Sequence, residues 1–233
     1  MHTLLLFLAG PMQSWGHRSR FDDRDTGLEP TRSGVIGLIC AAMGLPREGD
    51  LSRFDGLRMG VRVDAPGRVM VDYQTAMDVI KADGGGTGTV TSRRHYLSDA
   101  RFLVGFESDD LDLLCEIDSA LRMPVWPTFL GRKSFVPSVP VFLPGSSVRP
   151  DIGLEQALQD HPFVRMRRWE QMPSAPVRLV IEAKERAVSD LTRNDVPLDF
   201  ALRRFGLRQV RTDWVPAEDF KDGGVWPCSS PSS

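Results

Sequence analysis

Two short basic segments carry the side chains best suited to binding phosphate groups. The first is Arg93-Arg94-His95-Tyr96, and the second is the glycine-led run Gly131-Arg132-Lys133-Ser134. An arginine can bind a phosphate through two parallel hydrogen bonds and can also stack on a base. The second run is not a nucleotide-hydrolysing P-loop, because that motif requires glycine directly before the lysine and Arg132 stands there. Both segments favour contact with a nucleic-acid backbone, although exposed charged turns have the same composition.

The first loop of the chain adds an aromatic ring and the start of a helix. Gln13 and Trp15 follow an apolar strand, and the helix start Thr31-Arg32-Ser33 comes after a polar loop. Free N–H groups at a helix start can bind anions, and a tryptophan can stack on an unpaired base. Two simpler interpretations stay open: Trp15 covers the core, and the two hydroxyl groups only cap the helix.

The histidines allow a nuclease as an alternative. Metal-independent cleavage of RNA needs a base and an acid near a 2′-hydroxyl group, often histidine with tyrosine or lysine. His17 in the first loop could converge with His95 and Tyr96. The three cysteines and the clustered acidic residues show no metal-ligand spacing. We therefore expect no metal and no cofactor, and the nuclease alternative would have to use these histidines and Tyr96 alone.

Hydrophobic periodicity predicts the elements that must position these residues. Apolar runs and period-two alternation predict the strands, and period-3.6 spacing predicts the helices. A glycine-rich stretch at 82–89 separates two extended segments, which predicts a long hairpin with a flexible tip. The expected order is strand, helix, strand, hairpin, strand and helix, over 2–9, 31–45, 57–64, 69–98, 100–107 and 109–123.

This order predicts an α+β, ferredoxin-like (RRM-type) fold with a long projecting hairpin. We expect the ferredoxin-like domain over 1–148, with the hairpin at about 72–99. A small, mainly β C-terminal part is expected over 149–228, and the end of the chain, 229–233, is expected to be disordered. The expected elements of the C-terminal part are a helix at 153–160 and strands at 177–183 and 207–214.

Charge and hydropathy narrow the class of protein. The 233 residues carry a net charge of −2, with 26% charged and 41% hydrophobic residues, which is typical of a soluble globular protein. The chain has no global basic field, so nucleic-acid binding must use local patches. Most of the 29 basic residues are arginines, a bias that suits RNA and that a GC-rich genome would also produce. The apolar start is too short for a membrane span, and the scattered cysteines fit a reducing cytoplasm.

Four segments of the chain occur in an order that is typical of one family. They are Gly10-Pro11-Met12-Gln13-Ser14-Trp15-Gly16 with Pro30-Thr31-Arg32-Ser33-Gly34, Asp72-Tyr73-Gln74-Thr75, Arg94-His95-Tyr96-Leu97-Ser98-Asp99-Ala100, and Leu130-Gly131-Arg132-Lys133-Ser134. They resemble, in turn, the opening, the thumb entry, the thumb exit and the glycine-rich loop of the CasD family. CasD is the CRISPR-associated RAMP subunit that holds the 5′ handle of crRNA in the type I-E Cascade complex. The resemblance is closest over residues 1–145.

The resemblance implies a non-catalytic crRNA-binding and assembly subunit that acts in antiviral defence. Such a subunit would hold the 5′ handle, cap the CasC backbone and dock the large subunit CasA. It would meet target DNA only through the complex, and a separate subunit, CasE, would cut the RNA. A metal-independent endoribonuclease that processes CRISPR repeat RNA is the alternative, and a pure protein scaffold is a third hypothesis. The predicted RNA-binding residues are Gln13, Trp15, Thr31, Arg32, Ser33, Tyr73, Arg93, Arg94, Tyr96, Gly131, Arg132, Lys133 and Ser134.

Overall fold

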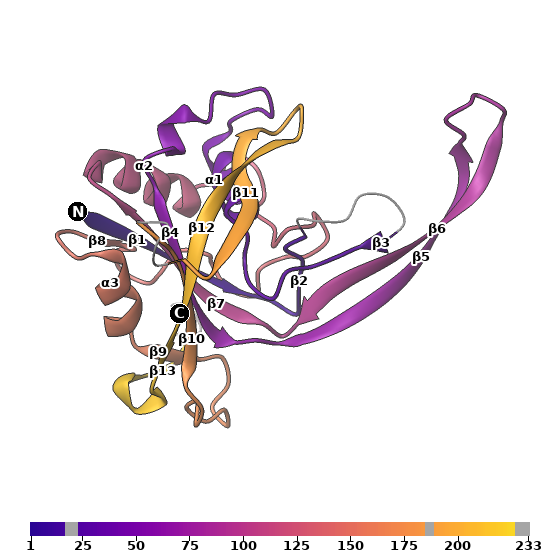
Figure 1. Cartoon of the computed structure of the whole chain (residues 1–233). Coiled ribbons are helices and arrows are strands. Elements are labelled where there is room, and N and C mark those ends of the chain that lie inside the picture. The colour runs from indigo at the N-terminus through magenta and orange to yellow at the C-terminus, as the bar shows by residue number, and fades with distance from the viewer. Residues whose placement is uncertain (17–22, 185–188, 227–233) are drawn as a thin grey trace, which may run out of the picture.

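A seven-stranded antiparallel sheet forms the centre of the protein (Figure 1). The computed structural model describes residues 1–16, 23–184 and 189–226. The mixture of antiparallel sheets with a few helices confirms the predicted α+β class. In the order β11-β12-β10-β4-β7-β1-β8, the strands are β11 (Leu191–Asp199), β12 (Arg204–Val215), β10 (Val177–Glu182), β4 (Arg58–Ala65), β7 (Arg101–Ser108), β1 (His2–Ala9) and β8 (Val148–Arg149).

The first strand is apolar on both faces because both sides of the sheet are covered. Leu4, Leu6 and Leu8 of β1 belong to one hydrophobic core. Leu5 and Phe7 belong to a second core on the opposite face. Successive side chains of a strand point to opposite faces, so a strand between two cores reads as a continuous apolar run.

Helices α1 (Arg32–Met43) and α2 (Leu111–Arg122) pack on one face of the sheet, and α3 (Leu154–Asp160) packs on the other. Thr31 caps α1, and its side-chain oxygen accepts a hydrogen bond from the N–H group of the third helical residue. Gly44 ends α1 in the left-handed conformation, with φ +72°. The predicted helix at 31–45 is thus confirmed to within two residues at its end.

Two glycines on the central strands allow α3 to lie close to the sheet. A Cβ atom on Gly105 of β7 would stand 2.6 Å from the side chain of Leu154. One on Gly60 of β4 would stand 2.8 Å from Leu158. Any larger residue at these positions would push α3 away from the second core.

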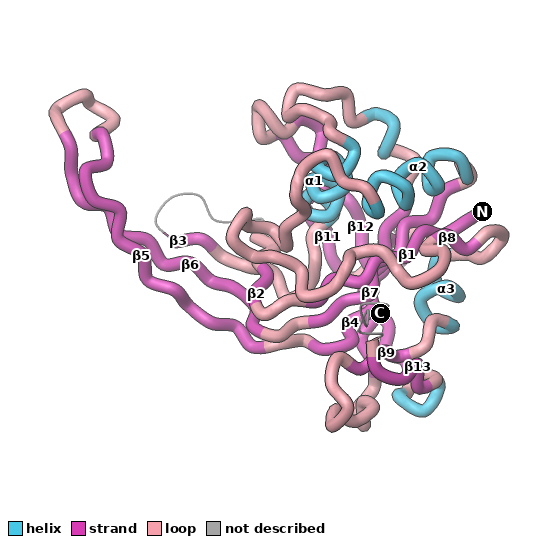
Figure 2. The backbone as a smooth tube through the Cα atoms, turned by 180° about the vertical axis from the view of Figure 1, so that it is seen from behind, coloured by secondary structure: helices cyan, strands magenta, loops and turns pink. Residues whose placement is uncertain are grey.

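A long hairpin projects from the body of the protein, as Figures 1 and 2 show. Its strands are β5 (Arg68–Ile80) and β6 (Thr87–Ser98), which pair antiparallel over almost their whole length. The other edge of β6 pairs near its base with β2 (Met12–Gln13) and β3 (Asp23–Arg24). The predicted long hairpin is confirmed as an element, although β6 already begins within the expected glycine-rich tip.

The C-terminal strands extend the sheet that the N-terminal half begins. β10 pairs antiparallel with β4, and β12 lies between β10 and β11. The strand β11 was not predicted. The proposed boundary after residue 148 falls inside β8, and the division into two parts stays a prediction. The remaining short elements are β9 (Phe163–Arg165), which pairs in parallel with β13 (Asp222–Val225), and the 3-10 turns η1 (Ser52–Phe54) and η3 (Ala217–Asp219).

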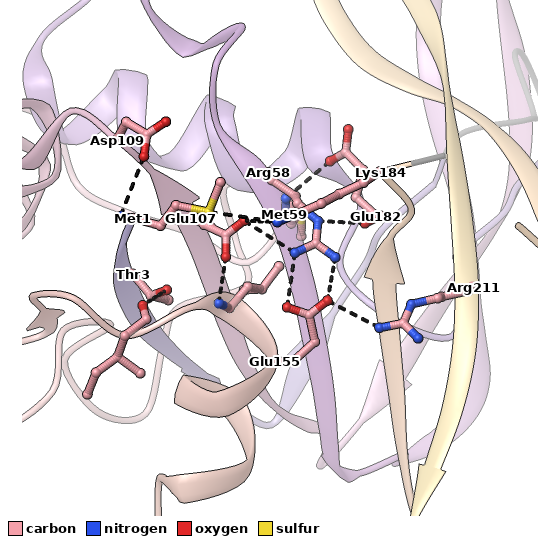
Figure 3. A network of polar contacts seen from close by, with 12 residues as sticks. Met1, Thr3, Arg58, Met59, Glu107, Asp109, Glu155, Glu182, Lys184 and Arg211 are labelled. Carbon is pink, nitrogen blue, oxygen red and sulfur yellow. Dashed lines mark hydrogen bonds and ion pairs between the residues drawn. The ribbon is translucent and has the colours of Figure 1, made fainter. Parts of the chain in front are cut away.

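A network of ion pairs joins the two halves of the chain (Figure 3). Arg58 on β4 donates to the carboxylate of Glu155 on α3 at 3.0 Å and to the carbonyl of Glu182 on β10 at 2.8 Å. Arg211 on β12 pairs with Glu155 at 3.1 Å. The hydrogen bond from Arg58 is the main cause that lowers the pKa of Glu155 to about 2. The network therefore fixes α3 against strands from both halves.

Two expectations fall outside the described residues. The expected disordered end, 229–233, lies there, and so does His17 of the alternative nuclease set. Among the described residues, no helix has the length and apolar character needed to cross a membrane.

Candidate nucleic-acid interface

A cleft of about 400 Å³ opens where three of the predicted segments meet, at the base of the β5–β6 hairpin. The first loop, the start of α1 and the Gly131 loop supply one side of the cleft. The β11–β12 turn supplies the other side through Phe200, Arg203 and Phe205. The structure thus brings together segments that lie far apart in the sequence, and it adds a wall that was not predicted.

Three arginines gather beside this cleft. Arg24 and Arg94 are register partners across the parallel β3–β6 ladder, and Arg24 also lines the cleft together with Arg132. Arg132 donates from Nη2 to the carbonyl of His95 at 2.9 Å. Burial lowers the pKa of Arg132, and the positive charges of Arg94 and Arg24 lower it further, against the opposing charge of Asp72. None of the three arginines forms an ion pair with a carboxylate in the described part of the chain. An anion bound here would relieve their mutual repulsion.

Gly131 allows the basic loop to lie directly against the first loop. Its φ is +90°, and a Cβ atom there would stand 1.7 Å from the carbonyl oxygen of Ser14. The amide of Ser14 donates to the carbonyl of Leu130 at 3.1 Å, which ties the two loops together. Only glycine permits this approach. The predicted residues Lys133 and Ser134 are exposed next to this junction.

Gln13 and Trp15 are buried, which corrects their predicted direct contact with RNA. The Trp15 side chain is only 1% exposed, and its indole N–H donates to the side-chain oxygen of Gln13 at 3.1 Å. The amide nitrogen of Gln13 donates to the carbonyl of Ala100 at 2.7 Å. A Cβ atom on Gly34 would stand 2.9 Å from the Trp15 ring, so α1 packs directly on the indole. The simpler interpretation, that Trp15 covers the core, is confirmed.

Arg32 points into the protein and not towards a ligand, so its predicted role as a phosphate contact is wrong. Its side chain is 3% exposed. It donates to the carbonyl of Phe54 at 2.9 Å and forms an ion pair with Glu182 at 2.8 Å. A buried guanidinium held in this way supports the fold.

The start of α1 is already satisfied by protein groups. The amide of Arg32 donates to a carboxylate oxygen of Asp195 at 2.9 Å, and the amide of Gly34 donates to the hydroxyl of Thr31 at 3.3 Å. A carboxylate at a helix N-terminus occupies the place that an anion would take. Thr31 therefore acts as the cap, and the half-buried Ser33 is left on the wall of the cleft.

The two faces of the hairpin present different predicted residues. Tyr73 is the register partner of Arg93, and Asp72 is the partner of Arg94. Because alternate residues share a face, Arg93 and Tyr73 lie on one face, while Arg94 and Tyr96 lie on the other. Tyr73 is 64% exposed, and Arg93 is exposed as well. Tyr96 packs against a phenylalanine of the Gly131 loop, with ring centroids 5.9 Å apart. Only the Arg94 face joins the arginine cluster.

Sequence reasoning missed Arg24 and the β11–β12 turn. Arg24 lies in the polar loop before the first helix, and no local sequence pattern predicts its pairing with β6. One strand beside the turn was predicted, at 207–214, but its partner β11 was not, so the turn between them was missed. Its wall residue Phe205 is 37% exposed, and Arg203 is exposed beside it.

The sequence matches a known protein family over most of its length. A model of the family described as CRISPR-associated protein (Cas_Cas5) matches residues 3–211. The chain belongs to the CasD/Cas5 family. It is 35% identical over 156 residues to the "CRISPR system Cascade subunit CasD" of Escherichia coli, an alignment that covers 60% of this chain and 69% of that relative.

Solved structures of this family share the fold. The structure titled "Crystal structure of Cas protein" is 40% identical, with a TM-score of 0.76 over 95% of this chain and 98% of that one. A chain of a "CRISPR RNA-guided surveillance complex" is 36% identical, with a TM-score of 0.77 over 95% of this chain and 94% of that one. The predicted resemblance to the CasD family is therefore confirmed.

Proposed function

We propose that this chain is a non-catalytic crRNA-binding and assembly subunit of a type I-E Cascade complex, and that it holds the 5′ handle of crRNA. The cluster of Arg24, Arg94 and Arg132 beside the hairpin-base cleft carries this proposal. These cations have no carboxylate ion-pair partner in the described chain. The carbonyl of His95 holds the Arg132 guanidinium, and the hydroxyl of Ser92 holds that of Arg94. Charged groups that a fold leaves unpaired and pre-arranged are suited to bind a phosphate backbone.

The shape of the cleft supports binding of a single strand. Arginines flank an opening that also contains the aromatic rings of Phe200 and Phe205. Proteins read single-stranded RNA by combining phosphate contacts with bases that are splayed out and stacked on aromatic side chains. Such readout uses unpaired nucleotides, as a 5′ handle would present. Lys133 and Ser134, exposed at the edge of the Gly131 loop, would contact the same strand.

The architecture supports the finer parts of the proposal. The strands β1, β4, β7 and β8 with α1 and α2 follow the βαββαβ order of a ferredoxin-like domain of the RAMP type. We infer that the β5–β6 hairpin is its thumb. Met77 and Ile80 near the hairpin tip are 77% and 79% exposed, which fits a protein partner such as CasC. Capping of the CasC backbone, docking of CasA and action in the cytoplasm, with target DNA met through the complex, complete the proposal.

The nuclease alternative receives no support from the hairpin. His95 and Tyr96 are neighbours on β6, so their side chains point to opposite faces of the strand. His95 Nε2 lies 3.1 Å from a carboxylate oxygen of Asp23. A base and an acid that face away from each other do not converge on one 2′-hydroxyl group. Incubation with labelled CRISPR repeat RNA in EDTA tests this directly: cleavage that His95→Ala abolishes would overturn the non-catalytic role.

The arginine cluster can be tested by charge removal. Arg94→Ala and Arg132→Ala should each weaken binding of crRNA by about 10-fold to 100-fold, because hydrogen bonds to charged groups contribute about 1.5–3 kcal/mol. The dependence of binding on salt concentration should become shallower in both variants. Deletion of residues 82–90 should lower the yield of the assembled complex. Arg53→Ala is the matched control, because Arg53 is an exposed arginine that pairs with Glu116 of α2 and does not line the cleft.

Normal crRNA content and normal complex yield in all three variants would reject the proposal. If the complex assembles normally without the two arginines while RNA binding persists, the basic residues are only solvated and the chain acts as a protein scaffold.

A further inference from the structure

The loop between β9 and β10 exposes an aromatic ring next to two cations. The Trp169 side chain is 72% exposed, and Arg167 and Arg168 are exposed beside it. The guanidinium carbon of Arg167 lies 5.1 Å from the centroid of the Trp169 ring. Neither arginine forms an ion pair with a carboxylate in the ranges that the structure describes. A large exposed indole flanked by unpaired cations is typical of a recognition surface.

A partly buried glutamate holds this loop in shape. One carboxylate oxygen of Glu170 accepts hydrogen bonds from the amides of Met166 at 2.7 Å and Arg167 at 3.4 Å. The same oxygen pairs with Arg101 of β7 at 2.5 Å. Burial opposes the ionised form of Glu170, but the hydrogen bond and charge of Arg101 prevail and lower its pKa. Trp169 is therefore exposed on a fixed loop, so little ordering entropy would be lost when a ligand binds.

A cleft of about 560 Å³ lies against this loop. Residues 9–11, Asp99 and Ser138 also line this cleft. Arg101 and Glu170 form an ion pair in the cleft, and the charges of Arg167 and Asp99 on its lining also cancel, so the positive surplus at this loop comes from Arg168, which is exposed next to Arg167. Four charged side chains line this cleft, whereas the centre of a protein-docking surface is depleted of charged residues.

This cleft is separate from the arginine cluster. Both views place the loop between β9 and β10 at the end of the body opposite α1 and α2 (Figures 1 and 2). The hairpin-base cleft, in contrast, is lined by the start of α1. Residues 9–11 line this cleft and residues 14–16 line the hairpin-base cleft, so the two clefts share no residue.

We propose that the Trp169 loop and its cleft form a second nucleic-acid site, which binds a single strand without reading its sequence. One base stacks on the indole, and Arg167 and Arg168 neutralise the adjacent phosphates. Bases in a duplex are already stacked on their neighbours, so only a single strand offers a free face to the ring. This site is additional to the proposed binding of the 5′ handle, because it shares no residue with the arginine cluster.

The test uses the full chain and two labelled uridine homopolymers, one of RNA and one of DNA. The starting protein carries Arg94→Ala and Arg132→Ala, so that the hairpin-base site is disabled. Adding Trp169→Ala should weaken binding by about 5-fold to 150-fold, since stacking of one base contributes that range. Trp214→Ala is the matched control, because Trp214 is a similarly exposed tryptophan (63%) that lines neither cleft. Arg167→Ala with Arg168→Ala should weaken binding and flatten its salt dependence.

The outcomes separate this site from the proposed function. If Trp169→Ala weakens binding of both polymers equally, the site binds single strands in general. If it weakens binding of the RNA polymer alone, the strand that the site binds is the guide RNA. Unchanged binding by Trp169→Ala overturns the second site, even if Arg94→Ala lowers handle binding as proposed. Loss of a partner subunit from the complex, with polymer binding unchanged, also overturns it and shows that Trp169 anchors a protein. Thermal unfolding should not change in Trp169→Ala, because the side chain is mostly in solvent.

Discussion

The junction between the two RNA-facing loops should fail when a single methyl group is added at Gly131. In Gly131→Ala, the new Cβ atom would have to move from 1.7 Å to at least 3.0 Å from the carbonyl oxygen of Ser14. The oxygen belongs to backbone, so the loops themselves must separate. That movement would break the hydrogen bond between the amide of Ser14 and the carbonyl of Leu130. It would also displace Arg132 from the carbonyl of His95.

The size of the effect follows from these contacts. The left-handed conformation costs an alanine about 1–2 kcal/mol, and each lost hydrogen bond costs about 1 kcal/mol. We therefore expect Gly131→Ala to lower the free energy of unfolding by about 3 kcal/mol. For a chain of this size, that corresponds to a fall of about 6–12 °C in the melting temperature. Binding of crRNA should weaken as well, because Arg132 leaves the cluster.

Gly145→Ala provides the matched control. Gly145 also has a positive φ, +75°, but a Cβ atom there would meet no atom within 4 Å. The free energy of unfolding of Gly145→Ala should fall only by the conformational cost, about 1–2 kcal/mol, and this variant should bind crRNA normally. Thermal unfolding and RNA titration of the two variants, measured side by side, separate the steric contact from the effect of φ. Equal melting temperatures and equal affinities would refute the reasoning.

Two further perturbations probe the groups that hold the cleft. Asp195→Ala should lower the free energy of unfolding by about 3–5 kcal/mol, because it leaves the buried Arg208 guanidinium and the amide of Arg32 without their carboxylate. The half-buried Asp199, which accepts one hydrogen bond from the amide of Leu202, provides the control, and a loss no larger than that of Asp199→Ala in denaturant unfolding would contradict this. Burial lowers the pKa of His161 from 6.5 to about 4. Between these pH values the imidazole is protonated in the unfolded chain and neutral in the folded protein. The free energy of unfolding should therefore fall on the order of 3 kcal/mol as the pH drops from about 6.5 to 4. His161→Gln should show a shallower fall in unfolding experiments across that range. Identical pH profiles of the two proteins would exclude His161 as the cause.

The local patterns of the sequence determined the elements. The apolar run at the start specifies a strand buried on both faces, and period-two alternation around a glycine-rich turn specifies the hairpin. The hydroxyl at Thr31 and the glycine at Gly44 mark the two ends of α1. These features depend on neighbouring residues, so they are readable along the chain. The basic Gly131 loop could be predicted for the same reason.

The tertiary structure alone decided which of the predicted side chains face a ligand. Trp15 and Arg32 have the right chemistry for RNA, yet their partners are a packed helix and the distant Glu182, so both are buried. Arg24 joins the cluster only because β3 pairs with β6 across a long stretch of sequence. A guanidinium has the same chemistry in a core ion pair as in a phosphate site. What separates the two roles is whether a carboxylate lies within ion-pair distance, and long-range pairing of strands sets that distance.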